Sequence, residues 1–261
     1  MAALVSAGCI AAEEEADTLL AAAAGDGDRL ADLVARRCTG EPLAWLVGSV
    51  RFCGETIAVH PGVYVPRWQT EAMALEAATR LPDSGIAVDL CTGAGAIAVV
   101  LRRRRPGARV VATDIDPRAV ACARANGVDA YEGDLAAGLP ADVHGVVDVV
   151  TAVVPYVPTE ALHLLPRDVL AYEPRAALDG GPGGTRDLER AAVAAAGLLR
   201  PDGSLLLELG GDQADALELV LAEHGYRDVE HLDDANGDRR ALACRKGGPA
   251  GRSDRELTAP T

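Results

Sequence analysis

The chain has 261 residues, of which 49% are apolar, enough for one full hydrophobic core and a small accessory domain. Its 39 acidic and 25 basic side chains give a formal charge of −14. This balance argues against nucleic acid as a partner, because phosphate binding needs a basic surface. No stretch approaches the roughly 20 apolar residues of a membrane-spanning helix, so we expect no membrane partner either.

The cysteine pattern and the first residues of the chain indicate the cellular compartment in which we expect the protein. The six cysteines are scattered, with no Cys-x-x-Cys pair, which is typical of reduced thiols in a cytosolic protein and predicts no metal site. The apolar residues 1–12 lack a basic segment and run directly into three glutamates at 13–15, so they do not fit a signal peptide. We therefore expect a cytoplasmic protein.

The N-terminal part predicts a small helical lobe over residues 1–48. It is rich in Ala and Leu, and a Gly-Asp-Gly-Asp run at 25–28 divides it into two helices. Residues 40–66 alternate apolar and polar side chains, which predicts a β-hairpin linker over 49–69. Thr70 then stands at the expected N-cap of the next helix.

A strand, a glycine turn and a helix follow one another at residues 86–105. Gly93 and Gly95 let the backbone pass close to a ligand, because glycine has no Cβ. About 20 residues later a second apolar strand, 109–113, ends in Asp114, whose carboxylate can accept both hydroxyls of a ribose. The pair predicts a nucleotide-containing cofactor, and its spacing alone fits both a nicotinamide and an adenosyl cofactor.

Two further strands lead to the same edge of the predicted sheet. The strand at 128–131 is followed by Asp134, which could read an adenine amino group. The strand at 145–151 runs into a proline-bracketed loop at 152–158, where we expect the substrate that accepts the transferred group.

The C-terminal third predicts alternating helices and strands. In chain order we expect a helix at 186–199, a turn at 201–203, a strand at 204–209, a helix at 213–225 and a hairpin with strands at 227–232 and 239–245. A terminal antiparallel hairpin is not typical of an ordinary dinucleotide-binding fold. Residues 247–261 are rich in Gly, Pro and charged side chains, and we expect them to form a disordered tail.

The chain resembles the HemK/PrmC family, S-adenosylmethionine-dependent methyltransferases that modify the glutamine side chain of peptide-chain release factors. The ordered matches, between about residues 38 and 245, include Gly40-Glu-Pro-Leu-Ala-Trp-Leu-Val-Gly48, Val65-Pro-Arg67, Asp89-Leu-Cys-Thr-Gly-Ala-Gly95, Thr113-Asp114, Glu132-Gly-Asp134, Pro155-Tyr156 and Glu173-Pro174. The resemblance implies an α/β fold: a Rossmann-like class I methyltransferase sheet over 70–246, with the small helical lobe before it.

The resemblance also implies a cofactor site. The glycine turn would line the methionine end of the cofactor, Asp114 the ribose, and Asp134 with Leu135 the adenine. Arg67 would orient loop carboxylates, with Glu71 nearby. The full set of implied cofactor residues is Arg67, Thr70, Cys91, Thr92, Gly93, Ala94, Gly95, Asp114, Ile115, Gly133, Asp134, Leu135 and Val153.

The predicted catalytic loop departs from the family pattern. Where the family carries Asn-Pro-Pro-Tyr, this chain reads Val153, Val154, Pro155 and Tyr156. A carboxamide nitrogen is a poor nucleophile, and the asparagine oxygen with a neighbouring backbone carbonyl would hold its two N–H groups and aim it. Val153 has no side-chain acceptor, and one such contact is worth roughly 2 to 4 kcal/mol.

Three interpretations are open. The chain could methylate a protein glutamine with altered chemistry. It could instead methylate a different, possibly small-molecule acceptor that needs no asparagine, with His144 or His163 as the base for a hydroxyl group. It could also bind the cofactor without catalysis, as a sensor or partner.

Overall fold

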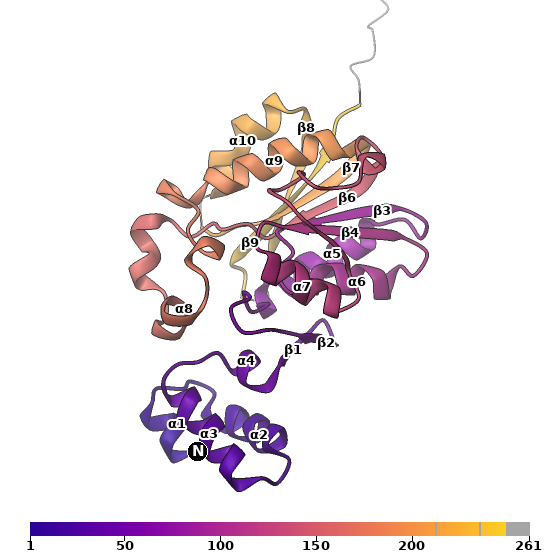
Figure 1. The fold of residues 1–261 in the computed structure, drawn as a ribbon. Helices are drawn as coiled ribbons and strands as arrows, with labels where there is room; N and C mark the ends of the chain where they lie inside the picture. The colour runs from indigo at the N-terminus through magenta and orange to yellow at the C-terminus, as the bar shows by residue number, and fades with distance from the viewer. Residues whose placement is uncertain (212, 235, 249–261) are drawn as a thin grey trace, which may run out of the picture.

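The computed structural model describes residues 1–211, 213–234 and 236–248, and a seven-stranded sheet forms its centre (Figure 1). The strand order is β5-β4-β3-β6-β7-β9-β8. Strands β3 to β7 run parallel, whereas β9 is antiparallel to both of its neighbours. The strands are β3 (Ile86–Leu90), β4 (Arg109–Asp114), β5 (Asp129–Glu132), β6 (Val147–Ala152), β7 (Leu199–Glu208), β8 (Tyr226–Asp233) and β9 (Arg239–Lys246). This sheet, with its C-terminal hairpin, confirms the predicted fold class.

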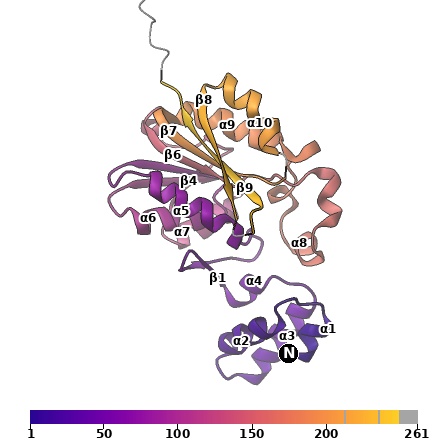
Figure 2. The same ribbon diagram turned by 180° about the vertical axis from the view of Figure 1, so that it is seen from behind.

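Helices cover both faces of the sheet, as Figures 1 and 2 show from opposite sides. One face carries α5 (Glu71–Arg80), α6 (Ala96–Arg104) and α7 (Pro117–Ala125). The other carries α9 (Arg186–Leu198) and α10 (Gln213–Glu223). Because both faces are covered, the central strands are apolar on both sides, and this explains why β3 and β6 read as nearly continuous apolar runs.

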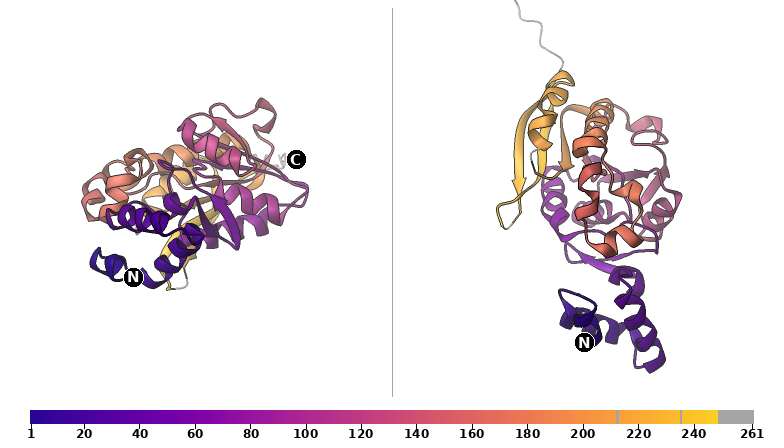
Figure 3. Two further views of the ribbon diagram at one scale, coloured as in Figure 1. Left: turned by 60° about the horizontal axis from the view of Figure 1, so that its bottom comes forward. Right: turned by 90° about the vertical axis from the view of Figure 1, so that its left-hand side faces the viewer.

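The first four helices form a lobe beside the sheet domain (Figure 3). They are α1 (Ala2–Ser6), α2 (Ala12–Ala23), α3 (Gly27–Cys38) and α4 (Leu43–Val47), packed around a small apolar cluster of their own. The predicted break lies between α2 and α3, where the Asp26 side chain caps α3 by accepting the N–H groups of Asp28 and Arg29. The short helices α1 and α4 were not predicted, because each is only 5 residues long and carries little periodic signal.

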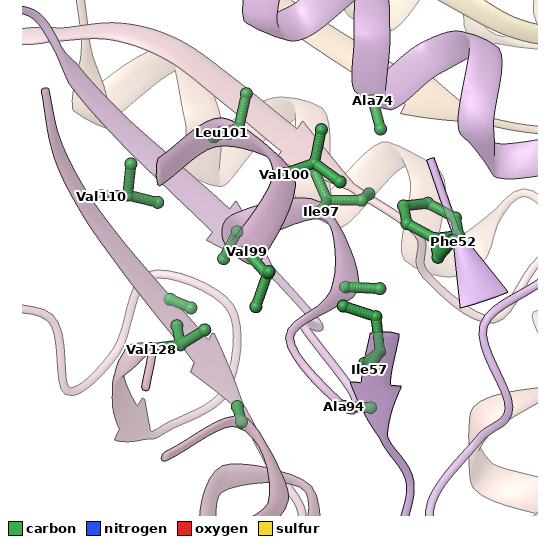
Figure 4. Packing of buried hydrophobic residues seen from close by; sticks show 14 of the residues in the cluster. Phe52, Ile57, Ala74, Ala94, Ile97, Val99, Val100, Leu101, Val110 and Val128 are labelled. Atoms are coloured by element: carbon green, nitrogen blue, oxygen red, sulfur yellow. The ribbon is translucent and has the colours of Figure 1, made fainter. Parts of the chain in front are cut away.

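A hairpin of β1 (Ser49–Phe52) and β2 (Glu55–Ala58) joins the lobe to the sheet domain. Its apolar residues enter the main core: Phe52 lies beside Ile97 of α6, and Ile57 lies beside Ala94 (Figure 4). The hairpin therefore fixes the lobe against the turn that precedes α6. The domain limits predicted at 48/49, 69/70 and 246/247 stay predictions.

Two local predictions need correction. Thr70 holds the N-cap position of α5, but its side chain makes no capping hydrogen bond, because a 3-10 helix, η1 (Trp68–Thr70), already places it in helical conformation. The expected turn at 201–203 lies within β7, which begins at Leu199 opposite Val147 and shifts register before Ser204. Most of the predicted tail, residues 249–261, lies outside the described residues.

The segment between β6 and α9 is built from short helices. These are η3 (Thr159–Leu164), α8 (Arg167–Tyr172), η4 (Arg175–Ala177) and η5 (Pro182–Gly184), while η2 (Ala141–Val143) precedes β6. The Tyr172 ring meets Trp45 of α4 edge-on, with ring centroids 6.3 Å apart. This contact connects the segment to the helical lobe.

Candidate active site

A cavity of about 1260 Å³ lies at the carboxyl ends of the central strands, where parallel α/β sheets bind ligands. The glycine turn, the end of β4 and the loop after β6 line one side of it. The lobe and the segment from Leu165 to Leu178 line the other. Chain segments far apart in sequence therefore enclose one site.

The glycine turn between β3 and α6 is held in an unusual backbone conformation. Cys91, Gly93 and Gly95 all have positive φ, at 54°, 55° and 83°. Gly93 lines the cavity, and no described atom stands within 4 Å of where its Cβ would be. Gly95 instead packs against α7, so its Cβ would stand 3.1 Å from that of Ala123. The two glycines therefore serve different purposes, one open to a ligand and one required by packing.

Asp114 lies at the end of β4 and faces the cavity. Its Oδ2 accepts the Gly93 N–H at 2.8 Å, and its Oδ1 accepts the Asp116 N–H at 2.9 Å. Burial raises the pKa of this carboxyl, and the backbone hydrogen bonds counter that rise. A fixed acceptor beside an open glycine is what a ribose needs, so these residues fit an adenosyl cofactor.

A buried carboxylate below the turn was not predicted as part of the site. Asp89 is 1% exposed and accepts the hydroxyls of Thr92 at 2.6 Å and Thr151 at 2.7 Å. Burial raises its pKa from 3.8 to about 6. Asp89 thereby joins the glycine turn to β6. In the sequence it was a polar residue inside an apolar strand and the first residue of the Asp89–Gly95 match, but neither observation assigned it a role. Cys91, also in the turn, is a poor nucleophile because burial raises the pKa of its thiol.

The predicted catalytic loop, Val153 to Tyr156, lines the cavity directly after β6. Val154 is buried, whereas Val153, Pro155 and Tyr156 are partly exposed. The Tyr156 hydroxyl donates to Glu208 Oε1 at 2.9 Å, and the Tyr156 carbonyl accepts the Gln213 side-chain N–H at 2.7 Å. The loop is therefore anchored to β7 and α10.

Arg67 also lines the cavity, and it pairs with a loop carboxylate, although not with the nearby Glu71. Its guanidinium forms an ion pair with Glu173, whose side chain is 2% exposed, and it stacks 4.9 Å from the Tyr64 ring centroid. Glu71 instead accepts the Cys53 N–H at 2.9 Å. Adjacency in sequence suggested Glu71, whereas the fold brings Glu173 from 106 residues away.

Several predicted residues lie elsewhere among the described part of the chain. Gly133, Asp134 and Leu135 do not line this cavity: Asp134 pairs with Arg190 at 2.6 Å, and the Leu135 carbonyl accepts the Thr113 hydroxyl. Their role toward adenine stays a prediction. His144 and His163 are exposed and do not line the cavity, so neither is placed as a base. The remaining predicted residues that line it are Thr70, Cys91, Thr92, Ala94 and Ile115.

Some cavity residues were missed by sequence reasoning. Glu208 and Arg240 reach the cavity from β7 and β9, and Tyr64 from the linker. Cys9 and Arg37 come from the lobe. Strand pairing and lobe packing bring them together, and no local motif marks them. Among the described residues, no group of three His, Cys, Asp or Glu side chains could hold a metal ion.

A sheet of this order, with a glycine turn after its first central strand and an acidic residue ending the next, defines a class I S-adenosylmethionine-dependent methyltransferase. The family model of the methyltransferase small domain matches residues 56–142.

None of the helices in the described ranges is long and apolar enough to cross a membrane.

Comparison with known proteins identifies the family. The release factor glutamine methyltransferase of Moorella thermoacetica is 42% identical over 247 residues, covering 90% of this chain and 83% of its own. That of Geobacter sulfurreducens is 37% identical, covering 82% and 77%. The structure of the E. cuniculi Mtq2-Trm112 complex, responsible for methylation of the eRF1 translation termination factor, has a TM-score of 0.50 and 25% identity, covering 72% and 99%. The chain belongs to the HemK/PrmC family of release factor glutamine methyltransferases.

Proposed function

We propose that this methyltransferase transfers a methyl group from S-adenosylmethionine to the side-chain nitrogen of a glutamine in a peptide-chain release factor. The observation that carries the proposal is the continuous cavity, which extends from Gly93 and Asp114 to the Val153–Tyr156 loop and on to the helical lobe. A cofactor end and an acceptor end are thereby adjacent, beside a surface that a protein substrate can reach. The names of the relatives from Moorella and Geobacter support the same acceptor.

The main requirement of methyl transfer is that the protein aligns the acceptor nitrogen with the methyl group. When bound, S-adenosylmethionine supplies a methyl group already activated by its sulfonium. Gly93 would line the methionine end of the cofactor, Asp114 would hold the ribose, and the loop at 153–156 would hold the acceptor. As the acceptor nitrogen bonds to the methyl carbon, the C–S bond electrons stay on sulfur and one N–H proton leaves to water. No covalent enzyme nucleophile is needed.

Val153 favours a second candidate, a different acceptor of better intrinsic nucleophilicity, such as a small molecule. A valine at this position offers no oxygen to hold a carboxamide N–H group. An amine or hydroxyl acceptor would not need that contact. The cavity volume, about 1260 Å³, leaves room for such a molecule beside the cofactor.

Methyl transfer from labelled S-adenosylmethionine to a purified release factor carrying its Gly-Gly-Gln loop tests the proposal. A factor with that glutamine replaced by alanine is the control. We expect label that depends on the glutamine. Cofactor binding without any transfer to the factor would overturn the proposal and favour the second candidate.

We also infer a cytoplasmic location, where release factors act. All six cysteines are free thiols, which supports a reducing compartment. Fractionation of the native cells would check this location.

A further inference from the structure

Glu208 is a buried carboxylate that the cofactor chemistry does not use. It ends β7, is 2% exposed and lines the cavity. Its Oε1 accepts the Tyr156 hydroxyl, but within the described residues its Oε2 is buried and makes no hydrogen bond. A buried oxygen of this kind is costly, because its desolvation is not offset by a donor. Such an atom beside a cavity indicates a donor that arrives with a ligand.

The sheet register places Glu208 beside the loop that departs from the family pattern. Ala152, the last residue of β6, pairs with Leu207 of β7 in parallel register. Val153 and Glu208 directly follow these two residues along the chain, and both line the cavity. The carboxylate therefore lines the same cavity as the position where the family carries its asparagine.

The same register separates Glu208 from the ribose end of the cavity. Asp114 ends β4, and three strand spacings, β4-β3-β6-β7, lie between it and Glu208. At about 4.8 Å a spacing, that is about 14 Å. We therefore expect the hydrogen-bond donor to Glu208 Oε2 to belong to the methyl acceptor and not to the ribose.

The groups around Glu208 stabilise its carboxylate but leave Oε2 without a hydrogen-bond donor. Burial raises the pKa of Glu208, while the nearby hydroxyls of Thr70 and Tyr156 and the positive charges of Arg240 and Arg67 lower it. The Thr70 hydroxyl lies near the carboxylate but does not meet hydrogen-bond geometry with Oε2, whereas the Tyr156 hydroxyl does bond to Oε1. Arg67 is itself paired with Glu173. The Tyr156 hydrogen bond fixes the rotation of the carboxylate, so that Oε2 is the oxygen left for a ligand.

We propose that Glu208 Oε2 accepts an N–H of the acceptor carboxamide, supplying from β7 the contact that Val153 cannot supply from the loop. This inference rests on the proposed function, because it assigns Glu208 to a glutamine acceptor. Glu208 thereby becomes an acceptor-binding residue whose partner is a primary amide. Tyr156 acts through it as a positioning residue.

A double-mutant cycle tests this assignment. Glu208→Gln keeps the shape but replaces the free acceptor with a donor, and Val153→Asn restores an acceptor in the loop. With a release factor as substrate, we expect Glu208→Gln to lower kcat by about 10²-fold, the effect of removing one preorganised contact. In that background Val153→Asn should recover most of the loss, whereas in the wild type it should change kcat far less.

Controls separate this role from a structural one. The affinity for S-adenosylhomocysteine should be alike in all four proteins, each should unfold in one cooperative transition, and Glu230→Gln, which changes an exposed carboxylate on β8, should leave kcat unchanged. If Glu208→Gln does not fold, Tyr156→Phe serves instead, with a smaller loss that Val153→Asn also recovers. Equal effects of Val153→Asn in both backgrounds would overturn the assignment while leaving the proposed function intact. A wild type that labels no glutamine would overturn both.

Discussion

The backbone N–H of Gly93 donates to Oδ2 of Asp114 across 2.8 Å, joining the glycine turn to the end of the neighbouring strand. The bond links two features that stand 21 residues apart in the sequence. Both residues line the cavity. The predicted cofactor site therefore depends on the pairing of β3 with β4 and not on either strand alone.

Removal of the Asp114 carboxylate should weaken the cofactor site. In Asp114→Ala the ribose loses its acceptor, and hydrogen bonds to a charged group are worth about 1.5–3 kcal/mol, so affinity for S-adenosylhomocysteine should fall about 10- to 100-fold. Calorimetric titration measures this. Asp142→Ala, which removes an exposed carboxylate paired with Arg109 at the start of β4, is the matched control. Equal affinities in the two variants would contradict the assignment.

The two glycines of the turn should respond differently to alanine. Gly95→Ala places a Cβ 3.0 Å from Val128 Cγ2 in a left-handed backbone, and we expect a loss of about 2–4 kcal/mol in unfolding free energy. Gly93→Ala meets no described atom and should cost about 1–2 kcal/mol for the backbone alone.

For ligand binding, Gly93→Ala should have the larger effect and Gly95→Ala the smaller one. The new methyl group of Gly93→Ala enters the cavity and should weaken S-adenosylhomocysteine binding more than Gly95→Ala does in the folded fraction. Urea unfolding and titration together check both orders. A Gly93→Ala protein with full affinity would show that the cofactor does not approach this turn.

Asp89 should give the protein a distinctive stability profile with pH. Its folded pKa, about 6, lies above the ordinary value of 3.8, so between these values the folded state holds more protons than the unfolded state. Its contribution to the unfolding free energy therefore falls as pH rises from about 4 to 6, by on the order of 3 kcal/mol, and is constant above.

Asp89→Asn removes this titration. Relative to the wild type, the variant should gain unfolding free energy between pH 4 and pH 7, measured by urea unfolding at each pH. The comparison isolates one group, because Thr92 and Thr151 can still bond an amide. Parallel profiles for the two proteins would mean that Asp89 does not titrate in this window.

The Arg67–Glu173 ion pair should matter more than the surface pairs. Arg67→Met removes the guanidinium that pairs with the Glu173 carboxylate, whose side chain is 2% exposed, and losing a hydrogen bond to a charged group costs about 1.5–3 kcal/mol. Arg103→Met removes a side chain that is 71% exposed and should cost less than 1 kcal/mol. Thermal unfolding compares them. A similar loss in both would show that Arg67 carries no buried pair.

The positions of the strands and turns along the chain could be predicted from the sequence, because they depend on short runs of apolar, glycine and proline residues. The apolar strand before Gly93, the apolar strand ending in Asp114 and the terminal hairpin each carry their signal within a few residues. Buried parallel strands are apolar throughout, and turns need glycine or proline, so these elements could be placed by inspection. The family resemblance rested on the same local motifs.

The composition of the acceptor side was decided by tertiary structure. Parallel pairing of β6 with β7 brings Glu208 and the loop that begins at Val153 to one cavity, and Glu173 reaches Arg67 across 106 residues. A hydrogen bond or ion pair between distant residues has no sequence periodicity, because it forms only when packing brings the two side chains to one place. The sequence by itself determined where the apolar strands and the glycine turn lie, and from them it predicted a nucleotide-containing cofactor. Which carboxylates line the cavity was decided by strand pairing, because burial and register select them and local propensity does not.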